Sequence, residues 1–124
     1  MRSAPIAIAA AMLAAIPAPV AAQTAVDRAD ARCVLVLQVA ARDPKQKEAA
    51  GQGTFFFTGR LTGRGAAGAK LDAILLAAGK EITQPAQVQT ELNRCGAELT
   101  KASSDLRAAF QRLQQATRPT PPAK

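Results

Sequence analysis

The chain has 124 residues, of which 16 are Lys or Arg and nine are Asp or Glu, and its formal net charge is +7. This length allows one domain at most, and the absence of histidine removes the commonest general base and zinc ligand. The absence of Tyr and Trp removes two of the side chains that stack on bases, so we expect no nucleic acid partner.

Residues 1–22 have the three-part form of a secretory signal peptide. Arg2 is a short basic start, residues 6–16 are apolar, and residues 17–22 are Pro and small residues. We expect cleavage after Ala22 and a periplasmic or secreted mature protein. The alternative, an uncleaved membrane anchor, is disfavoured because a spanning helix needs roughly 20 apolar residues. No stable membrane insertion is expected.

Residues 26–42 are predicted to form the first helix. Residues 34–39 are apolar nearly all round, which predicts a central position in the fold. Their β-branched content also fits a buried strand, but alanine-rich flanks favour a helix. One stripe of this helix carries Val26, Ala29, Cys33, Leu37 and Ala40.

Asp43 and Pro44 predict the start of a second helix that runs to Leu61. The carboxylate would cap the free amides, and Pro suits the first helical position. Three interior glycines each weaken such a helix by roughly 1 kcal/mol relative to Ala. The expected compensation is close approach of another helix over the glycine face, which contains Gly51, Gly53 and Gly59.

Phe55, Phe56 and Phe57 are the candidate partner-binding residues. Consecutive helical residues are about 100° apart, so the three rings cannot share a narrow stripe. One interpretation places two rings in the core and the third half-buried. The functional alternative is an exposed aromatic patch that binds an apolar partner, an unfolded client or another copy of the chain.

Residues 63–68 match the letters of a dinucleotide-binding fingerprint, Gly-x-Gly-x-x-Gly. That motif requires a preceding strand and a βαβ unit, and the chain has no evident strand there. We interpret these glycines as a turn and expect no cofactor. A short helix over residues 70–78 is predicted to follow and to stop at Gly79.

A long helix is predicted to start at Thr83, with Pro85 in its first turn. Its apolar seam alternates steps of four and three residues, which is typical of a helix that packs lengthwise on partners. The seam consists of Val88, Leu92, Cys95, Leu99, Ala102, Leu106, Ala109 and Leu113.

One straight rod over residues 84–116 would be about 50 Å long, whereas a compact domain of this size has a radius of gyration of about 13 Å. The helix could break at Gly96 or at residues 103–105, or its distal half could project and pair with a second chain. We favour an unbroken or gently bent helix whose second half folds back over the first helix. Residues 117–124 are predicted to form a disordered, Pro-rich basic tail after a helical domain over residues 23–116.

Cys33 and Cys95 are the only cysteines, and both lie in strongly apolar helical stretches. In an oxidising compartment a pair in a small domain is most simply a disulfide. This bond would close a loop of 62 residues, for which the chain-entropy model gives roughly 4 kcal/mol. Two thiolates are too few for a structural zinc site, so no metal is expected.

The acidic residues show no catalytic pair. Asp27 with Asp30, and Glu91 with Glu98, are spaced as on solvated helix faces. Without histidine or paired carboxylates across a cleft, we expect no enzymatic activity. The predicted fold class is all-α: a bundle of about four helices closed by one disulfide, with a long C-terminal helix.

The pattern resembles small, exported, all-helical envelope proteins held by one disulfide, namely acid-activated periplasmic chaperones and periplasmic immunity proteins of secretion systems. It is also similar to exported Gram-negative proteins with the same arrangement. The resemblance rests on the signal peptide, on Cys33 early in an apolar helix, on residues 56–61, and on Cys95 with Gly96. It implies the fold and the compartment, and it assigns no binding residue.

Three functions follow as hypotheses. The first is a protein-binding module of the envelope, either chaperone-like or inhibitor-like, because of Phe55, Phe56, Phe57 and the leucine seam. The second is a structural or oligomerising protein, because the last helix is longer than the domain needs. The third is a basic adaptor to anionic envelope polymers, because 15 basic residues, without Arg2, oppose nine acidic ones.

Overall fold

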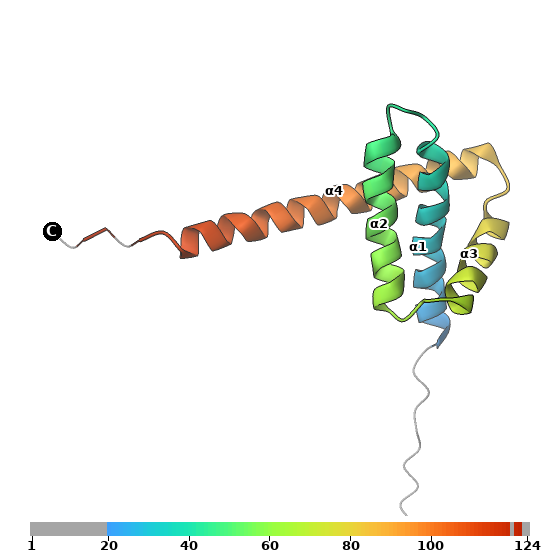
Figure 1. Ribbon diagram of the computed structural model, residues 1–124, viewed down its shortest axis with the longest axis horizontal. Helices are drawn as coiled ribbons and strands as arrows, with labels where there is room; N and C mark the ends of the chain where they lie inside the picture. The colour runs from blue at the N-terminus through green and yellow to red at the C-terminus, as the bar shows by residue number, and fades with distance from the viewer. Residues whose placement is uncertain (1–19, 120, 123–124) are drawn as a thin grey trace, which may run out of the picture.

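The computed structural model describes residues 20–119 and 121–122, which form four helices and no strand (Figure 1). The helices are α1 (Val20–Ala40), α2 (Lys47–Gly63), α3 (Ala69–Glu81) and α4 (Pro85–Ala116). The predicted all-α fold with a long last helix is therefore confirmed. The predicted signal peptide lies outside the described residues, except for the three residues that begin α1.

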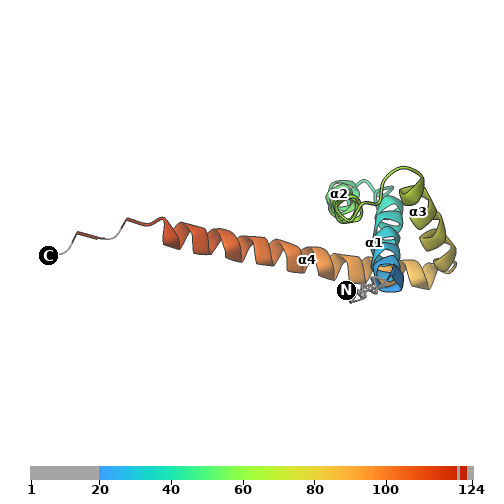
Figure 2. The same ribbon diagram turned by 90° about the horizontal axis from the view of Figure 1, so that it is seen from below.

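Helix α1 is the centre of the bundle. It lies between α2 and α3, and α4 crosses it (Figures 1 and 2). Because α1 is covered on several sides, its second half can be apolar nearly all round, which confirms the predicted helix in preference to a strand. The buried core draws on every helix and contains Ala31, Cys33, Val36, Leu37, Ala50, Phe57, Leu61, Ala66, Ala78 and Cys95.

The helix boundaries differ from the prediction by a few residues: α1, for example, covers Val20–Ala40 in place of residues 26–42. Two of the differences change local contacts. Helix α2 begins at Lys47 and not at Pro44, because Asp43 caps a turn that precedes the helix: its Oδ1 accepts a hydrogen bond from the Lys45 N–H at 2.9 Å. Helix α3 passes through Gly79 and ends at Glu81. The extra turn brings the Glu81 carboxylate to arginines of α1.

Of the three glycines of α2 named above, only Gly53 is closely approached by other helices. A Cβ on Gly53 would lie 2.8 Å from Leu99 Cδ1 and 2.9 Å from Leu37 Cδ1, so α2 meets both α1 and α4 at this point. Gly51 and Gly59 have no neighbour within 4 Å of a built Cβ. The expected compensation is therefore confirmed at Gly53 and wrong at the other two positions.

Helix α4 begins at Pro85, with Gln84 and not the predicted Thr83 at its N-cap, and continues without a break. Gln87 Oε1 accepts hydrogen bonds from the Thr83 N–H at 2.8 Å and the Gln84 N–H at 2.9 Å, and Pro85 occupies the first turn. Neither Gly96 nor residues 103–105 interrupt the helix, which ends at Ala116.

The expected return of α4 over α1 is wrong. Helix α4 crosses α1 and α2 instead of running along them, and then leaves the bundle (Figures 1 and 2). Two helices side by side are about 20 Å wide, which is roughly 13 residues of a helix that crosses them. The last seam residue packed on the core is Leu99. We call residues 100–116 the arm and the rest of the helical structure the head.

Candidate interaction surface

Ten charged side chains form one network of ion pairs that joins all four helices. Arg64, just after α2, bridges two carboxylates: its Nε lies 2.8 Å from Asp27 Oδ1 and its Nη2 lies 2.6 Å from Asp30 Oδ2. In order of contact, the members are Asp27, Arg64, Asp30, Arg60, Glu98, Arg94, Glu91, Arg32, Glu81 and Arg28.

Asp27 and Asp30 are buried, so their interpretation as a solvated pair is wrong. Burial of a carboxylate is costly unless it is paired and hydrogen-bonded. Asp30 meets this condition twice, because Arg60 Nε also lies 3.1 Å from its Oδ2. The sequence carried a signal for this arrangement: the i, i+3 spacing of the two acids matches the i, i+4 spacing of Arg60 and Arg64 on another helix.

The network keeps Arg64 fully charged. Partial burial lowers the pKa of the Arg64 guanidinium, but hydrogen bonds and Coulombic attraction to Asp30 and Asp27 outweigh it and raise the pKa above its usual value. A raised arginine pKa stabilises the fold below that value and ceases to do so only in strong alkali. The Arg64 guanidinium therefore keeps its charge throughout the neutral pH range.

The disulfide lies beside this network. Cys33 and Cys95 are bonded and fully buried, with their Cα atoms 5.6 Å apart, as predicted. Arg94 Nη2 donates to the Ala29 carbonyl at 2.8 Å and lies 3.2 Å from Cys33 Sγ. The Glu91 carboxylate lies close to both sulfur atoms, but sulfurs committed to a disulfide are not thiolate ligands for a metal.

The buried polar side chains of the head are hydrogen-bonded within the protein. Within the part of the chain that the structure describes, every buried side-chain nitrogen or oxygen has a hydrogen-bond partner. One groove of about 350 Å³ lies between α1, the end of α3 and the start of α4, but its charged lining residues are already paired, because Arg32 contacts both Glu81 and Glu91. The features left for recognition are therefore on the surface.

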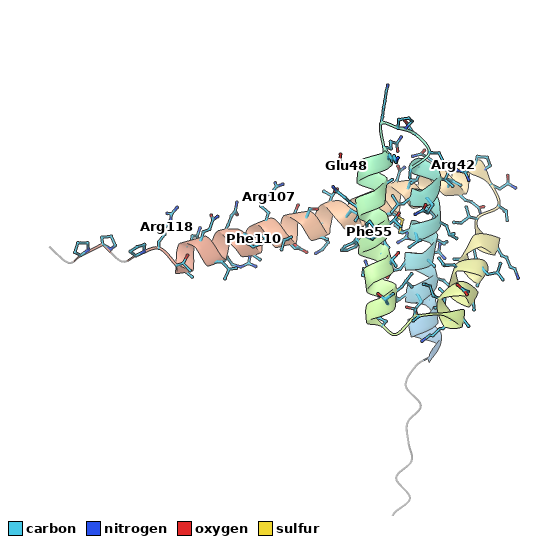
Figure 3. All side chains as sticks on the ribbon, viewed as in Figure 1. Arg42, Glu48, Phe55, Arg107, Phe110 and Arg118 are labelled. Atoms are coloured by element: carbon cyan, nitrogen blue, oxygen red, sulfur yellow. A yellow bond between two sulfur atoms is a disulfide. The ribbon has the colours of Figure 1, made fainter. Side chains whose placement is uncertain are left out.

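The three consecutive phenylalanines do not form one patch. Phe57 is fully buried, Phe56 is half-buried, and Phe55 is 81% exposed. Phe55 is labelled on α2 in Figure 3. The Phe56 and Phe57 rings meet edge to face with centroids 5.0 Å apart, and the Arg60 guanidinium lies over both. The expectation of two core rings and one half-buried ring is therefore wrong. Of the three candidate partner-binding residues, Phe57 is inaccessible and Phe55 is open to a partner.

The arm carries a continuous exposed apolar face. Three of its side chains are more than half exposed: Leu106 at 58%, Phe110 at 56% and Leu113 at 59%. Figure 3 shows Phe110 and Arg107 on the projecting part of α4, clear of the other helices. The seam that packs Val88 and Leu92 on the head thus continues into solvent.

A groove lies where the arm leaves the head. Its volume is about 590 Å³, and it is open between α2 and α4. Its apolar lining includes Gly53 and Phe56 from α2 and Leu99, Ala102 and Leu106 from α4. A second groove of about 380 Å³ continues along the arm past Phe110, so an apolar track runs outward from the head.

Charge on the arm and its end is predominantly basic. Residues 100–119 contain Lys101, Arg107, Arg112 and Arg118 against a single acid, Asp105. Five of the nine acidic residues of the chain are paired within the network of the head. The positive charge of the sequence is therefore concentrated outside that network.

No protein-family model, curated protein or solved structure matches the chain in the comparisons made. The four described helices include none with both the length and the hydropathy needed to cross a bilayer.

Proposed function

We propose that the chain is an exported protein-binding module, in which a disulfide-closed head holds a helical arm outward and the arm's apolar face binds a helix of a partner protein. The single observation that carries this proposal is that the seam used inside the head continues over the exposed Leu106, Phe110 and Leu113. A helix laid along such a face is a common mode of recognition.

Export is supported by the first 22 residues of the sequence and by the buried disulfide, because disulfides persist in oxidising compartments. The loop-closing bond also fixes α4 to α1 next to the point where the arm begins. The head then acts as a rigid base for the arm.

An inhibitor-like or scaffolding role is better supported than a general chaperone role. Promiscuous binders use flexible, Met-rich surfaces that repack around many clients. Both methionines of this chain, Met1 and Met12, lie in the predicted signal peptide, so none remains in the predicted mature protein. A pre-formed helix with a defined seam fits a single partner.

The proposal is tested by site-specific photo-crosslinking in the native envelope. A photoreactive residue at Phe110 is expected to give a discrete adduct, and the same residue at Leu76 of α3, which is 65% exposed, is the matched control. Adducts at Phe110 that disappear when Leu113→Ser is added support the proposal. No adduct at Phe110, or the same adducts from both sites, contradicts it.

The basic arm favours a second function, binding to an anionic envelope polymer. Four basic residues against one acid over residues 100–119 are the observation behind it. Binding of this kind weakens steeply with salt, because the exposed charges are screened. Retention on an anionic polymer that is unchanged between low and high salt, or that survives Arg107→Gln with Arg112→Gln, contradicts this function.

A further inference from the structure

Within the described part of the chain, the arm has little tertiary cover beyond its base, where it lines a groove with α2. It has 17 residues, counted from 100 to 116 of α4, and three large apolar side chains exposed on one face. Isolated helices of about this length are marginal in water, and most helical stability in proteins comes from packing of an amphipathic face. The arm therefore requires an occupant for that face, and the sequence around the seam indicates which one.

We infer that the occupant is a second copy of this chain, whose arm lies antiparallel on the first. This inference rests on the proposed function and names its partner. The seam residues alternate in size along the arm: Ala102, Leu106, Ala109, Leu113 and Ala116. An antiparallel register that places Leu106 opposite Ala109 of the second copy sets every leucine against an alanine.

The same register satisfies the size rule at the next layer of the arm, where Ala102 lies opposite Leu113 of the second copy. Leu99 is packed on the head and takes no part in the pairing. Alternation of large and small residues across facing positions is what lets helices interdigitate without voids. A parallel pair would instead set leucine against leucine and alanine against alanine in successive layers.

Charge complementarity selects the same arrangement. Asp105 and Arg112 both flank the seam on the side of Ala109, one heptad apart. In the antiparallel register Asp105 faces Arg112 of the second copy, and Arg112 faces Asp105 of the second copy. A parallel pair brings neither residue opposite a charge of the other sign, because Phe110 of the second copy would face Asp105 and Thr117 of the second copy would face Arg112.

The remaining side of the seam is complementary in shape. Ser103 and Phe110 flank it there, again one heptad apart, so the antiparallel register places Phe110 of the second copy beside Ser103. Ser103 lines the groove of about 590 Å³ between α2 and α4, together with Gly53 and Phe56. The aromatic ring thus enters the apolar groove at the base of the first arm.

The pairing is closed by a two-fold axis near the middle of the arms. Each copy uses the same surface, so the product is a dimer and not a filament. The heads lie at opposite ends, which keeps them apart. Because each copy contributes only three large apolar side chains, the interface is at the small end of specific interfaces and we expect micromolar affinity.

Charge reversal followed by sedimentation equilibrium tests the inference. Asp105→Arg alone and Arg112→Asp alone each place like charges across the interface, and we expect each to raise the dimer Kd by about tenfold. The double variant Asp105→Arg, Arg112→Asp restores opposite charges and is expected to return the Kd to near the wild-type value. Asp105→Arg also removes the exposed ion pair with Lys101 of the same chain. Because the double variant lacks that ion pair too, a recovered dimer Kd reports the contact between the two copies.

A second test removes an apolar side chain from the proposed interface with Phe110→Ser. Its matched control is Leu76→Ser on α3, because both side chains are more than half exposed. The first is expected to abolish the dimer and the second to leave it unchanged. Circular dichroism at low concentration checks that each variant keeps the folded head. The disulfide-linked head carries none of these substitutions in its core.

Three outcomes overturn the inference. They are a wild-type chain that remains monomeric at high concentration, a double variant that stays as weak as the single variants, and a monomer that binds vesicles of anionic phospholipid through Phe110. If the chain is monomeric but the photoreactive residue at Phe110 crosslinks a different protein, the second copy is excluded and the proposed function stands. If no protein is crosslinked at all, the proposed function fails as well.

Discussion

The Arg64 guanidinium, just after the end of α2, spans two buried carboxylates of α1, with Nη2 2.6 Å from Asp30 and Nε 2.8 Å from Asp27. This contact fixes the relative register of the two helices at one end, because a planar guanidinium presents its donors in a fixed fork. In the middle of the network Arg94 approaches the disulfide. The head is therefore held by directed polar contacts as well as by its small apolar core.

Removal of the central carboxylate tests how much this network stabilises the head. Asp30→Ala leaves Arg60 and Arg64 partly buried without their shared partner, and we expect the free energy of unfolding to fall by about 3 kcal/mol. Urea unfolding followed by circular dichroism measures the change. Asp105→Ala removes an exposed i, i+4 pair on the arm and is expected to cost less than about 1 kcal/mol. Equal losses in the two variants would contradict a structural role for the network.

Reduction of the disulfide is the second test. The bond closes a loop of 62 residues, so the double substitution Cys33→Ala, Cys95→Ala is expected to lower the free energy of unfolding by about 4 kcal/mol. The oxidised wild-type chain should show no free thiol and should lose the same stability in reductant. A variant that unfolds at the wild-type urea concentration would falsify this account.

The three glycines of α2 give a comparison within one helix. Gly51→Ala and Gly59→Ala add a methyl group into open space and are expected to raise the free energy of unfolding by about 0.5–1 kcal/mol each. Gly53→Ala pushes Leu37 and Leu99 apart at the junction of three helices, and we expect a net loss of about 1 kcal/mol, since overpacking exceeds the gain in helix propensity. The midpoint of thermal unfolding should lie above that of the wild-type chain for Gly51→Ala and Gly59→Ala, and below it for Gly53→Ala. A raised midpoint for Gly53→Ala would contradict the close approach.

The sequence predicted the elements of the fold because their signals are local. The period of the seam, the apolar length of α1 and the Pro85 start of α4 each depend on neighbouring residues only. The direction of α4 could not be predicted in this way. It follows from the crossing over α1 and α2, which depends on contacts such as Leu99 with Gly53 that join residues far apart in the chain.

The candidate interaction surface likewise has features that the sequence predicted and features that depend on tertiary contacts. The sequence singled out Phe55, Phe56 and Phe57, but which ring is exposed depends on the side of α2 that meets α1, and no local pattern encodes that rotation when all three residues are the same. The ion-pair network was missed because each acid has the spacing of a solvated residue, and its partners lie on other helices. The apolar seam of the arm can be read from the sequence. Its exposure cannot, because it depends on the angle at which α4 crosses α1 and α2.

Phe55 and Phe57 test the rotation of α2 directly. Phe57 is fully buried, so Phe57→Ala is expected to lower the free energy of unfolding by about 3–5 kcal/mol. Phe55 is 81% exposed, and Phe55→Ala should change that free energy by no more than about 0.5 kcal/mol. Urea titrations of both variants provide the comparison, and their slopes should match that of the wild-type chain if the fold is kept. A large loss for Phe55→Ala with a small one for Phe57→Ala would mean that α2 presents its other face to the core.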